Sequence, residues 1–295
     1  MNSNPIFGIH MQLYTTVRNL QKSISQNKQN GQKIAFVPTM GALHAGHLSL
    51  VKKAKQHADL VVVSIFINPS QFNNQQDLLK YPRMLEQDAY LLEQIDCEIL
   101  FVPLASEVYP AGLNPELKLE LGILDQVLEG EFRPGHFKGM LEVVYRLLDI
   151  VQPDILIMGQ KDFQQFTLVF NMIRQLKIPV QLIIGETLRE SDGLAMSSRN
   201  MRLSAEMRKI VPIIYQVLLE LKNQLYISEI DDLLSRELEK LNASGLITDY
   251  LRIVDGISLE PVLNPKNHDC IVACVACWAG DVRLIDNLVL KGPLH

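Results

Sequence analysis

The chain has 295 residues, of which 47% are hydrophobic and 21% are charged, a composition typical of globular proteins that excludes disorder as the main state. Its 28 Lys and Arg against 33 Asp and Glu give a formal net charge of −5, without the basic surplus of a nucleic-acid binder. No apolar run reaches the roughly 18 residues that span a bilayer, and residues 1–20 lack the apolar core of a signal peptide. We therefore expect a cytoplasmic protein with neither a nucleic-acid nor a membrane partner.

The first part of the chain alternates short apolar runs with helical stretches. The run Ile34–Val37 precedes a glycine-containing turn, a helical stretch Leu48–Ala58 and the run Leu60–Ile67, which together form a β-α-β unit. Short, wholly apolar strands are typical of a parallel sheet covered on both faces. We predict an α/β fold with a doubly wound parallel sheet in residues 1–187, and a ligand site at the carboxyl ends of its strands. The remaining predicted elements of this domain are the helices Met84–Ile95, Gly139–Ile150 and Phe163–Leu176 and the strands Ile99–Val102, Ile155–Met158 and Val180–Ile184.

Residues 188–295 have a different pattern, in which two amphipathic helical stretches precede three strand-like runs. This order predicts a second, smaller α+β domain at the C-terminus. The predicted helices are Ala205–Tyr226 and Glu229–Leu241, and the predicted strands are Tyr250–Val254, Cys270–Cys277 and Val282–Ile285.

A candidate phosphate site follows the first predicted strand, where the sequence reads Pro38-Thr-Met-Gly-Ala-Leu-His44-Ala-Gly46-His47. Its glycines permit tight turns and close backbone approach, and a helix start offers free N–H groups to an anion. Two imidazoles three residues apart can face one phosphate chain, although a lone pair of this kind is more often a helix cap or a surface pair. The spacing resembles the His-x-Gly-His signature of the nucleotidyltransferase superfamily, in which the histidines stabilise charge on a triphosphate.

Three further polar segments follow predicted strands or the domain junction. Asn68-Pro-Ser-Gln71-Phe72 begins a turn, and Gly159-Gln-Lys161-Asp162 opens a helix with a lysine that suits a phosphate and an aspartate that suits a ribose hydroxyl or a cap. Arg189–Asn200 combines hydroxyls, a glycine and arginines in the manner of a mobile loop that closes on phosphates.

Six ordered motifs together resemble the pantothenate synthetase family over nearly the whole chain. The resemblance implies a Rossmann-like N-terminal domain, a smaller C-terminal lid, a homodimer and an ATP-dependent, AMP-forming ligase that joins pantoate to β-alanine through a pantoyl-adenylate, with Mg²⁺, in pantothenate and coenzyme A biosynthesis. The motifs are Pro38-Thr-Met-Gly41 with His44-Ala-Gly-His47, Asn68-Pro-Ser-Gln-Phe72, Tyr81-Pro-Arg83, Arg133-Pro-Gly-His-Phe137, Gly159-Gln-Lys-Asp162 and Gly193-Leu-Ala-Met-Ser-Ser-Arg-Asn200.

The same resemblance assigns roles residue by residue. It implies His44, His47, Lys161 and Arg199 as catalytic residues, and Gln71 and Gln165 as the residues that bind pantoate or β-alanine. It implies no metal ligand on the protein. The ATP-binding residues it implies are Met40, Gly41, Ala42, Leu43, His44, Ala45, Gly46, His47, Gly159, Gln160, Lys161, Asp162, Leu188, Met196, Ser197, Ser198 and Arg199.

Two positions depart from the family pattern, because Glu142 stands where a threonine is usual and Phe163 where a tyrosine is common. Neither change removes a reacting group. Glu142 either alters how its helix frames the pantoate or β-alanine pocket or is an exposed helical residue. His136 belongs to a family motif, but its spacing assigns it no role.

The cysteines Cys270, Cys274 and Cys277 lie near His268 and raise the alternative of a zinc site. Their spacing is not a paired Cys-x-x-Cys, and they alternate with small and β-branched residues as buried cysteines in strands do. We therefore interpret them as strand residues and expect reduced thiols.

Two other functions compete with a carboxylate–amine ligase. One is a nucleotidyltransferase that attaches a nucleotide to a phosphate-bearing substrate and stops there. The other is a nucleotide-binding regulatory protein with a degenerate site. Lys161, His47 and Arg199 argue against degeneracy, and Gln71 and Gln165 suit a hydroxylated carboxylate better than a second phosphate.

Overall fold

The structure is a computed structural model, and it describes residues 11–71, 78–79, 81–111 and 117–294. The chain divides into two compact units, each built from several chain segments. The first comprises Met1–Lys118, Lys138–Met158 and Met172–Gly185, and the second comprises Leu119–Phe137, Gly159–Asn171 and Glu186–His295. The predicted boundary after residue 187 stays a prediction.

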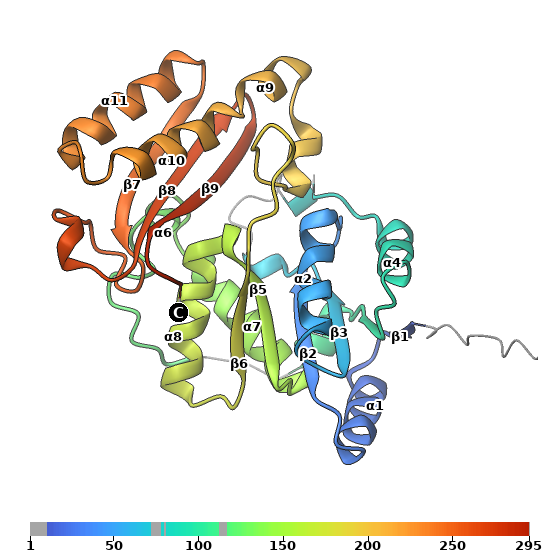
Figure 1. Ribbon diagram of the computed structural model, residues 1–295. Coiled ribbons are helices and arrows are strands. Elements are labelled where there is room, and N and C mark those ends of the chain that lie inside the picture. Colours follow the sequence, from blue (N-terminus) through green and yellow to red (C-terminus); the bar gives the residue numbers. More distant parts are fainter. Residues whose placement is uncertain (1–10, 72–77, 80, 112–116, 295) are drawn as a thin grey trace, which may run out of the picture. The chain divides into compact units, whose positions relative to one another are not determined.

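A six-stranded sheet with the order β1-β4-β3-β2-β5-β6 forms the centre of the first unit (Figure 1). The pairs β1–β4, β4–β3, β3–β2 and β2–β5 are parallel, which confirms the predicted α/β class. The inner strands are buried along nearly their whole length, as a sheet covered on both faces requires. The strands are β1 Gln12–Tyr14, β2 Ile34–Thr39, β3 Leu60–Ile65, β4 Ile99–Phe101, β5 Ile155–Gly159 and β6 Gln181–Gly185.

The strand order reverses between β2 and β5. From β2 the chain proceeds outward through β3 to β4, and it then returns to place β5 on the other side of β2. In doubly wound sheets such a reversal marks the place where ligands bind, outside the carboxyl ends of the strands. The segments that follow β2 and β5 are Met40–His44 and Gln160–Asp162, so the topology and the sequence motifs single out the same two segments.

Helices pack on this sheet through apolar side chains. Helix α2 contacts β2, β3 and β6, and it buries Val51 and Ala54 against the sheet side chains Val37 and Val63. The sequence pattern predicted neither β1 nor α1. Helix α1 is rich in Gln, Asn and Ser and buries only Leu20 and Ile24, so its apolar stripe is too narrow to stand out. The helices of this unit are α1 Val17–Gln29, α2 Ala45–Lys55, α4 Leu85–Glu93, α5 Ala105–Val108 and α7 His136–Val151, whose first two residues belong to the second unit, with the short 3₁₀ helix η1 at Pro69–Gln71.

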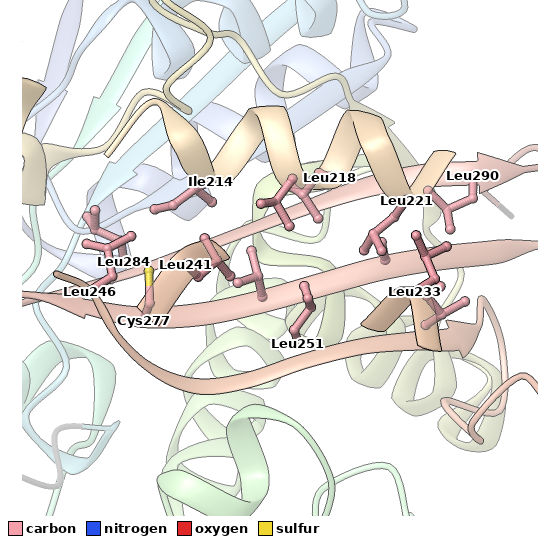
Figure 2. Close-up of a cluster of buried hydrophobic side chains, with 14 of the residues drawn as sticks. Ile214, Leu218, Leu221, Leu233, Leu241, Leu246, Leu251, Cys277, Leu284 and Leu290 are labelled. Atoms are coloured by element: carbon pink, nitrogen blue, oxygen red, sulfur yellow. The ribbon is translucent and has the colours of Figure 1, made fainter. Parts of the chain in front are cut away.

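The second unit contains a three-stranded antiparallel sheet, β7-β8-β9, which confirms the predicted α+β organisation of the C-terminal part. One face of this sheet packs against α10 and α11, and Figure 2 shows the leucines of these helices and Cys277 of β8 in their common core. The strands are β7 Ile247–Asp255, β8 Ile271–Ala279 and β9 Val282–Lys291, and the helices are α6 Glu129–Phe132, α9 Ala205–Ile210, α10 Ile213–Gln224 and α11 Ile230–Ala243, with η2 Gln160–Asp162, η3 Ser198–Arg202 and η4 Pro265–Asn267. Helix α8, Phe163–Leu176, begins in this unit and ends in the first.

The predicted helix Ala205–Tyr226 is wrong as a single element, because the structure divides it into α9 and α10. Pro212 stands at the start of α10, where its missing N–H costs no hydrogen bond, whereas in the middle of a helix it would remove one. Strand β9 is also longer than predicted and extends to Lys291. Among the described residues, no helix combines the length and the apolar character needed to cross a membrane.

Candidate functional site

The segment between β2 and α2 forms a tight loop with two consecutive residues of positive φ. Gly41 has φ +83° and Ala42 has φ +50°, so the chain turns sharply as it leaves the sheet. A Cβ atom on Gly41 would lie 3.0 Å from both Asp88 Oδ2 and Ile65 Cγ2, which explains why this position takes a glycine. The loop thus presents its backbone at the sheet edge where the sequence predicts ATP.

Asp88 of α4 holds this loop. Its carboxylate accepts hydrogen bonds from the backbone N–H groups of Ala42, at 2.8 Å, and Leu43, at 2.7 Å, and only 1% of the residue is exposed. Burial raises the pKa of Asp88, and the two backbone hydrogen bonds oppose that shift. None of the sequence motifs includes this residue. An available signal was that Asp88 and Leu92, the buried residues of α4, are four positions apart, so an acid stands on the core-facing stripe of a helix.

His44 and His47 form a reciprocal cap at the start of α2. The Nδ1 atom of His44 accepts from Gly46 N–H at 3.2 Å, the Nδ1 atom of His47 accepts from His44 N–H at 3.3 Å, and the ring centroids are 4.1 Å apart. An imidazole nitrogen that accepts a hydrogen bond carries no proton, so each neutral ring has its proton on Nε2. The two histidines therefore cap the start of α2, one of the roles considered from the sequence, and each neutral ring also has an N–H donor at Nε2.

The segment after β3 packs against the same loop and against α7. Gln71 donates from Nε2 to the sulfur of Met40 at 2.9 Å, so the structure brings together two of the predicted site residues. Asn68 is buried and donates from Nδ2 to Gly139 O at 3.1 Å and to Ser70 Oγ at 2.9 Å. Phe72, the last residue of this motif, lies outside the described residues.

The two departures from the family pattern have different surroundings. Glu142 is half-buried on α7, and Tyr109 has its pKa raised to about 12 by burial and by the charge of Glu142. Phe163 is buried and packs edge-on against Phe166, with ring centroids 5.5 Å apart, so an apolar ring satisfies this position without a hydroxyl.

In the second unit, Lys161 and Asp162 lie in the 3₁₀ turn η2, directly before α8. Gln164, the second residue of α8, is buried, and its side chain connects this turn to the segment 124–129 by hydrogen bonds. Its side chain accepts from Glu129 N–H at 2.9 Å and donates to the carbonyl oxygens of Leu124 and Val127, both at 2.7 Å. The neighbouring Gln165, the predicted pantoate ligand, is half-buried. Gln164 thereby fixes the first turn of α8, which carries Gln165.

A buried ionic cluster extends from the same segment. Glu129 accepts from Tyr250 Oη at 2.9 Å and from Arg283 Nη1 at 2.7 Å, while Arg283 also donates to Asp249 at 2.7 Å. Burial opposes the charge on Glu129, but the bonds from Arg283 and Tyr250 outweigh it and lower the pKa of Glu129. Arg133 of the Arg-Pro-Gly motif lies 3.9 Å from the same carboxylate. The cluster therefore anchors the chain that leads into this motif.

The predicted phosphate-closing loop is folded back on itself. Met196 N–H donates to Leu188 O at 3.0 Å, and Arg189 forms a bridge with Ala195, so Leu188 and Met196 lie side by side. Ser197 caps η3 by accepting from Arg199 N–H at 3.2 Å. The loop thus holds Met196–Arg199 at the beginning of η3, where backbone N–H groups and hydroxyls meet.

The cysteines of β8 do not converge. Cys274 and Cys277 are buried and three positions apart in the strand, so they point to opposite faces of the sheet, and Cys277 belongs to the core under α10. Cys270 precedes the strand. Among the residues that the structure describes, no three His, Cys, Asp or Glu side chains gather as a metal site.

Comparison with known proteins identifies the family. The pantoate-beta-alanine ligase family model matches residues 12–289. This chain belongs to the pantoate-beta-alanine ligase family. Among its relatives, the pantothenate synthetase of Azotobacter vinelandii is 42% identical over 92% of this chain and 96% of its own. The pantoate–beta-alanine ligase of Schizosaccharomyces pombe is 42% identical over 91% of this chain and 95% of its own.

Solved structures of the family share the fold. The pantothenate synthetase of Thermus thermophilus superposes with a TM-score of 0.89 at 39% identity and covers 95% of this chain and 100% of its own. The enzyme of Francisella tularensis, solved with Beta-gamma ATP and Beta-alanine, has a TM-score of 0.77 at 37% identity, and it covers 97% of this chain and 100% of its own. The fold predicted from the sequence is therefore that of a pantoate-beta-alanine ligase.

Proposed function

We infer that this chain is an AMP-forming ligase that condenses (R)-pantoate with β-alanine at the expense of ATP and yields pantothenate, AMP and pyrophosphate. The observation that carries this conclusion is the match to one family over residues 12–289, with relatives 42% identical over more than nine tenths of the chain. Both competing functions retain a nucleotide site, but neither accounts for a match of this length to a ligase.

The reaction has two steps, since a free carboxylate is a poor acylating group. A carboxylate oxygen of pantoate attacks the α-phosphorus of ATP, a P–O bond forms, and pyrophosphate leaves. The amine of β-alanine then attacks the acyl carbon of the pantoyl-adenylate, an amide bond forms, AMP leaves, and the amine releases a proton. The protein must align the reactants and stabilise the charge that moves to the leaving groups.

For the first step we propose that His44 and His47 donate from Nε2 to the phosphates of ATP. Their Nδ1 atoms already accept backbone N–H groups, which supports this choice of tautomer. Asp88 would keep the loop Gly41–Leu43 in place beneath the nucleotide through its two hydrogen bonds. The loop backbone from Met40 to His47 would then contact ATP.

We assign the remaining phosphate contacts to Lys161, Ser197, Ser198 and Arg199, whose cationic and hydroxyl groups suit developing negative charge. The position of Lys161 in η2 and of the serines at the start of η3 supports this assignment. The backbone of Gly159–Asp162, Leu188 and Met196 would contact the adenosine.

Gln71 and Gln165 are our candidates for binding pantoate. A side-chain amide supplies both a donor and an acceptor, which suits a ligand with hydroxyls and a carboxylate. Gln71 already packs its amide against Met40, at the edge where β2 ends, and this supports its role beside the nucleotide loop.

We further propose that Mg²⁺ enters as a complex with the phosphates of ATP, because the described residues gather no set of acidic or imidazole ligands. A homodimer, as the family resemblance implies, and a cytoplasmic location, supported by four free cysteines, complete the proposal. Two domains, 1–187 and a lid at 188–295, remain the expected arrangement. Sedimentation tests the homodimer, and limited proteolysis near residue 187 tests the domain boundary.

Pyrophosphate exchange tests the function directly. Labelled pyrophosphate should enter ATP in the presence of pantoate and Mg²⁺ without β-alanine, because the adenylate forms before the amine reacts. A nucleotidyltransferase for another substrate would ignore pantoate, and a degenerate nucleotide-binding protein would show no exchange. Exchange that depends on β-alanine would contradict the two-step mechanism.

A further inference from the structure

Two consecutive residues in the middle of β9, Asp286 and Asn287, are polar yet buried. None of the sequence motifs includes them. Each contacts a different segment of the second unit, and both segments belong to the predicted ATP site: the turn η2 and the loop that begins at Leu188.

Asn287, only 2% exposed, is bonded to the turn η2 by its side chain. Its Nδ2 donates to Gln160 O at 3.0 Å and to Lys161 O at 2.9 Å, and its Oδ1 accepts from Gln160 Nε2 at 3.3 Å. The side-chain amide therefore fixes the backbone from which the Lys161 ammonium projects. Because the two carbonyl groups share one amide nitrogen, small displacements of the turn would break both bonds.

Asp286, by contrast, holds the loop that begins at Leu188. Its carboxylate accepts from Arg189 Nη1 at 2.6 Å and Nη2 at 3.1 Å in a bidentate pair. The Arg189 guanidinium also donates to Gly193 O at 3.1 Å and stacks 3.8 Å from the ring centroid of Tyr215. These contacts all fix the loop, and Arg189 is a structural cation rather than a phosphate ligand.

The geometry of a strand explains how one dipeptide reaches both segments. Successive side chains in a strand point to opposite faces, and the register pairs Asp286 with Val275, on the α10 face, and Asn287 with Cys274, on the other face. A further bond from Arg189 Nη2 to Asn287 O, at 3.3 Å, connects the two sets of contacts. β9 therefore contacts the turn of Lys161 through the side chain of Asn287 on one face and, through the Asp286–Arg189 pair on the other face, the loop that leads to Ser197–Arg199.

We propose that Asp286 and Asn287 are positioning residues for adenylate formation: they fix the Lys161 turn and the 188–199 loop at a set separation, so that both present their donors to one triphosphate. Neither residue touches the nucleotide. The proposal rests on the proposed function. It adds that Asn287 affects adenylate formation by positioning Lys161, which the proposed function by itself does not require.

The test is a double-mutant cycle on pyrophosphate exchange with the variants N287A and K161A. N287A should slow exchange at least about tenfold, because misplacement of a reacting group by about 1 Å can cost on the order of 100-fold. If Asn287 acts through Lys161, the double variant should be no more than about twofold slower than K161A alone. Losses that multiply would overturn the proposal. N242A, an exposed asparagine on α11, is the matched control and should exchange like the wild type.

Hydrogen exchange of the peptide 159–165 supplies a measurement that needs no activity. N287A, and the equally sized N287D, should increase amide exchange in this peptide at least about tenfold while N242A leaves it unchanged. Unchanged protection in both variants would refute the positioning role even in an active enzyme. An inactive wild type with these exchange changes would instead refute the function and leave the contact assignment standing. Loss of the fold in both variants would count against the proposal, since Asn287 would then be needed for folding.

Discussion

Replacing Asp88 is the sharpest test of how the nucleotide loop is held. Two buried N–H groups, of Ala42 and Leu43, depend on its carboxylate at 2.8 and 2.7 Å. Leaving one buried donor without a partner costs about 1–3 kcal/mol. D88A should therefore lower the free energy of unfolding by about 2–6 kcal/mol, twice the cost of one such donor.

D88N should cost about half as much, because an amide oxygen can still accept one of the two N–H groups. Burial raises the pKa of Asp88, so removing the charge relieves a burial penalty and makes the expected loss for D88N smaller still. Urea unfolding measures both values, and hydrogen exchange of residues 40–48 localises them to the loop. The control is E86Q, an exposed acid on the same helix α4.

The loop also carries the histidine cap, so the same variants should impair catalysis. We expect kcat/KM for ATP in pyrophosphate exchange to fall at least about tenfold in D88A and less in D88N, because the loop precedes His44 directly. If D88A unfolds within about 0.5 kcal/mol of E86Q, the usual range for a surface substitution, and exchanges pyrophosphate normally, the reasoning about this loop is wrong.

Four further outcomes are expected. K161A and, similarly, H47A should slow adenylate formation at least about 100-fold, the scale for loss of a preorganised donor, and a change below about threefold in single-turnover assays would exclude Lys161 from the chemistry. Q71A and Q165A should each weaken pantoate binding about tenfold in calorimetry while ATP binding alone stays the same, and loss of ATP binding instead would move the pantoate pocket elsewhere. Folding lowers the pKa of Glu129 below its ordinary value of 4.5, so the stability that its carboxylate contributes is complete above pH 4.5. That stability is lost as the pH falls through the lowered pKa of the folded state. The free energy of unfolding of E129Q should therefore depend less on acid pH than that of the wild type. Purified protein should contain no stoichiometric zinc by mass spectrometry and keep its fold with a chelator, whereas one equivalent per chain would contradict the strand interpretation of the β8 cysteines.

The sequence alone located the inner strands β2, β3 and β5 and the segments that follow them. Their apolar runs are short and continuous, and glycine or proline follows each run closely, so local chemistry is sufficient to mark them. The same local signals failed for α1, whose buried residues are only Leu20 and Ile24, and for the break at Pro212, where a strong amphipathic pattern continues on both sides.

The motif residues of the candidate site are predictions from the sequence, made because the glycines, histidines and Lys161 follow strand ends at fixed offsets. The buried polar residues that hold these motif residues in place could not be predicted from the sequence. Asp88 lies 45 positions along the chain from Leu43, and Asn287 lies 126 positions from Lys161. A hydrogen-bond partner at such a separation depends on the path of the whole chain, which no local period or turn preference records. The sequence therefore predicts which groups do the chemistry, and only the tertiary structure decided which buried polar side chains hold their segments in place.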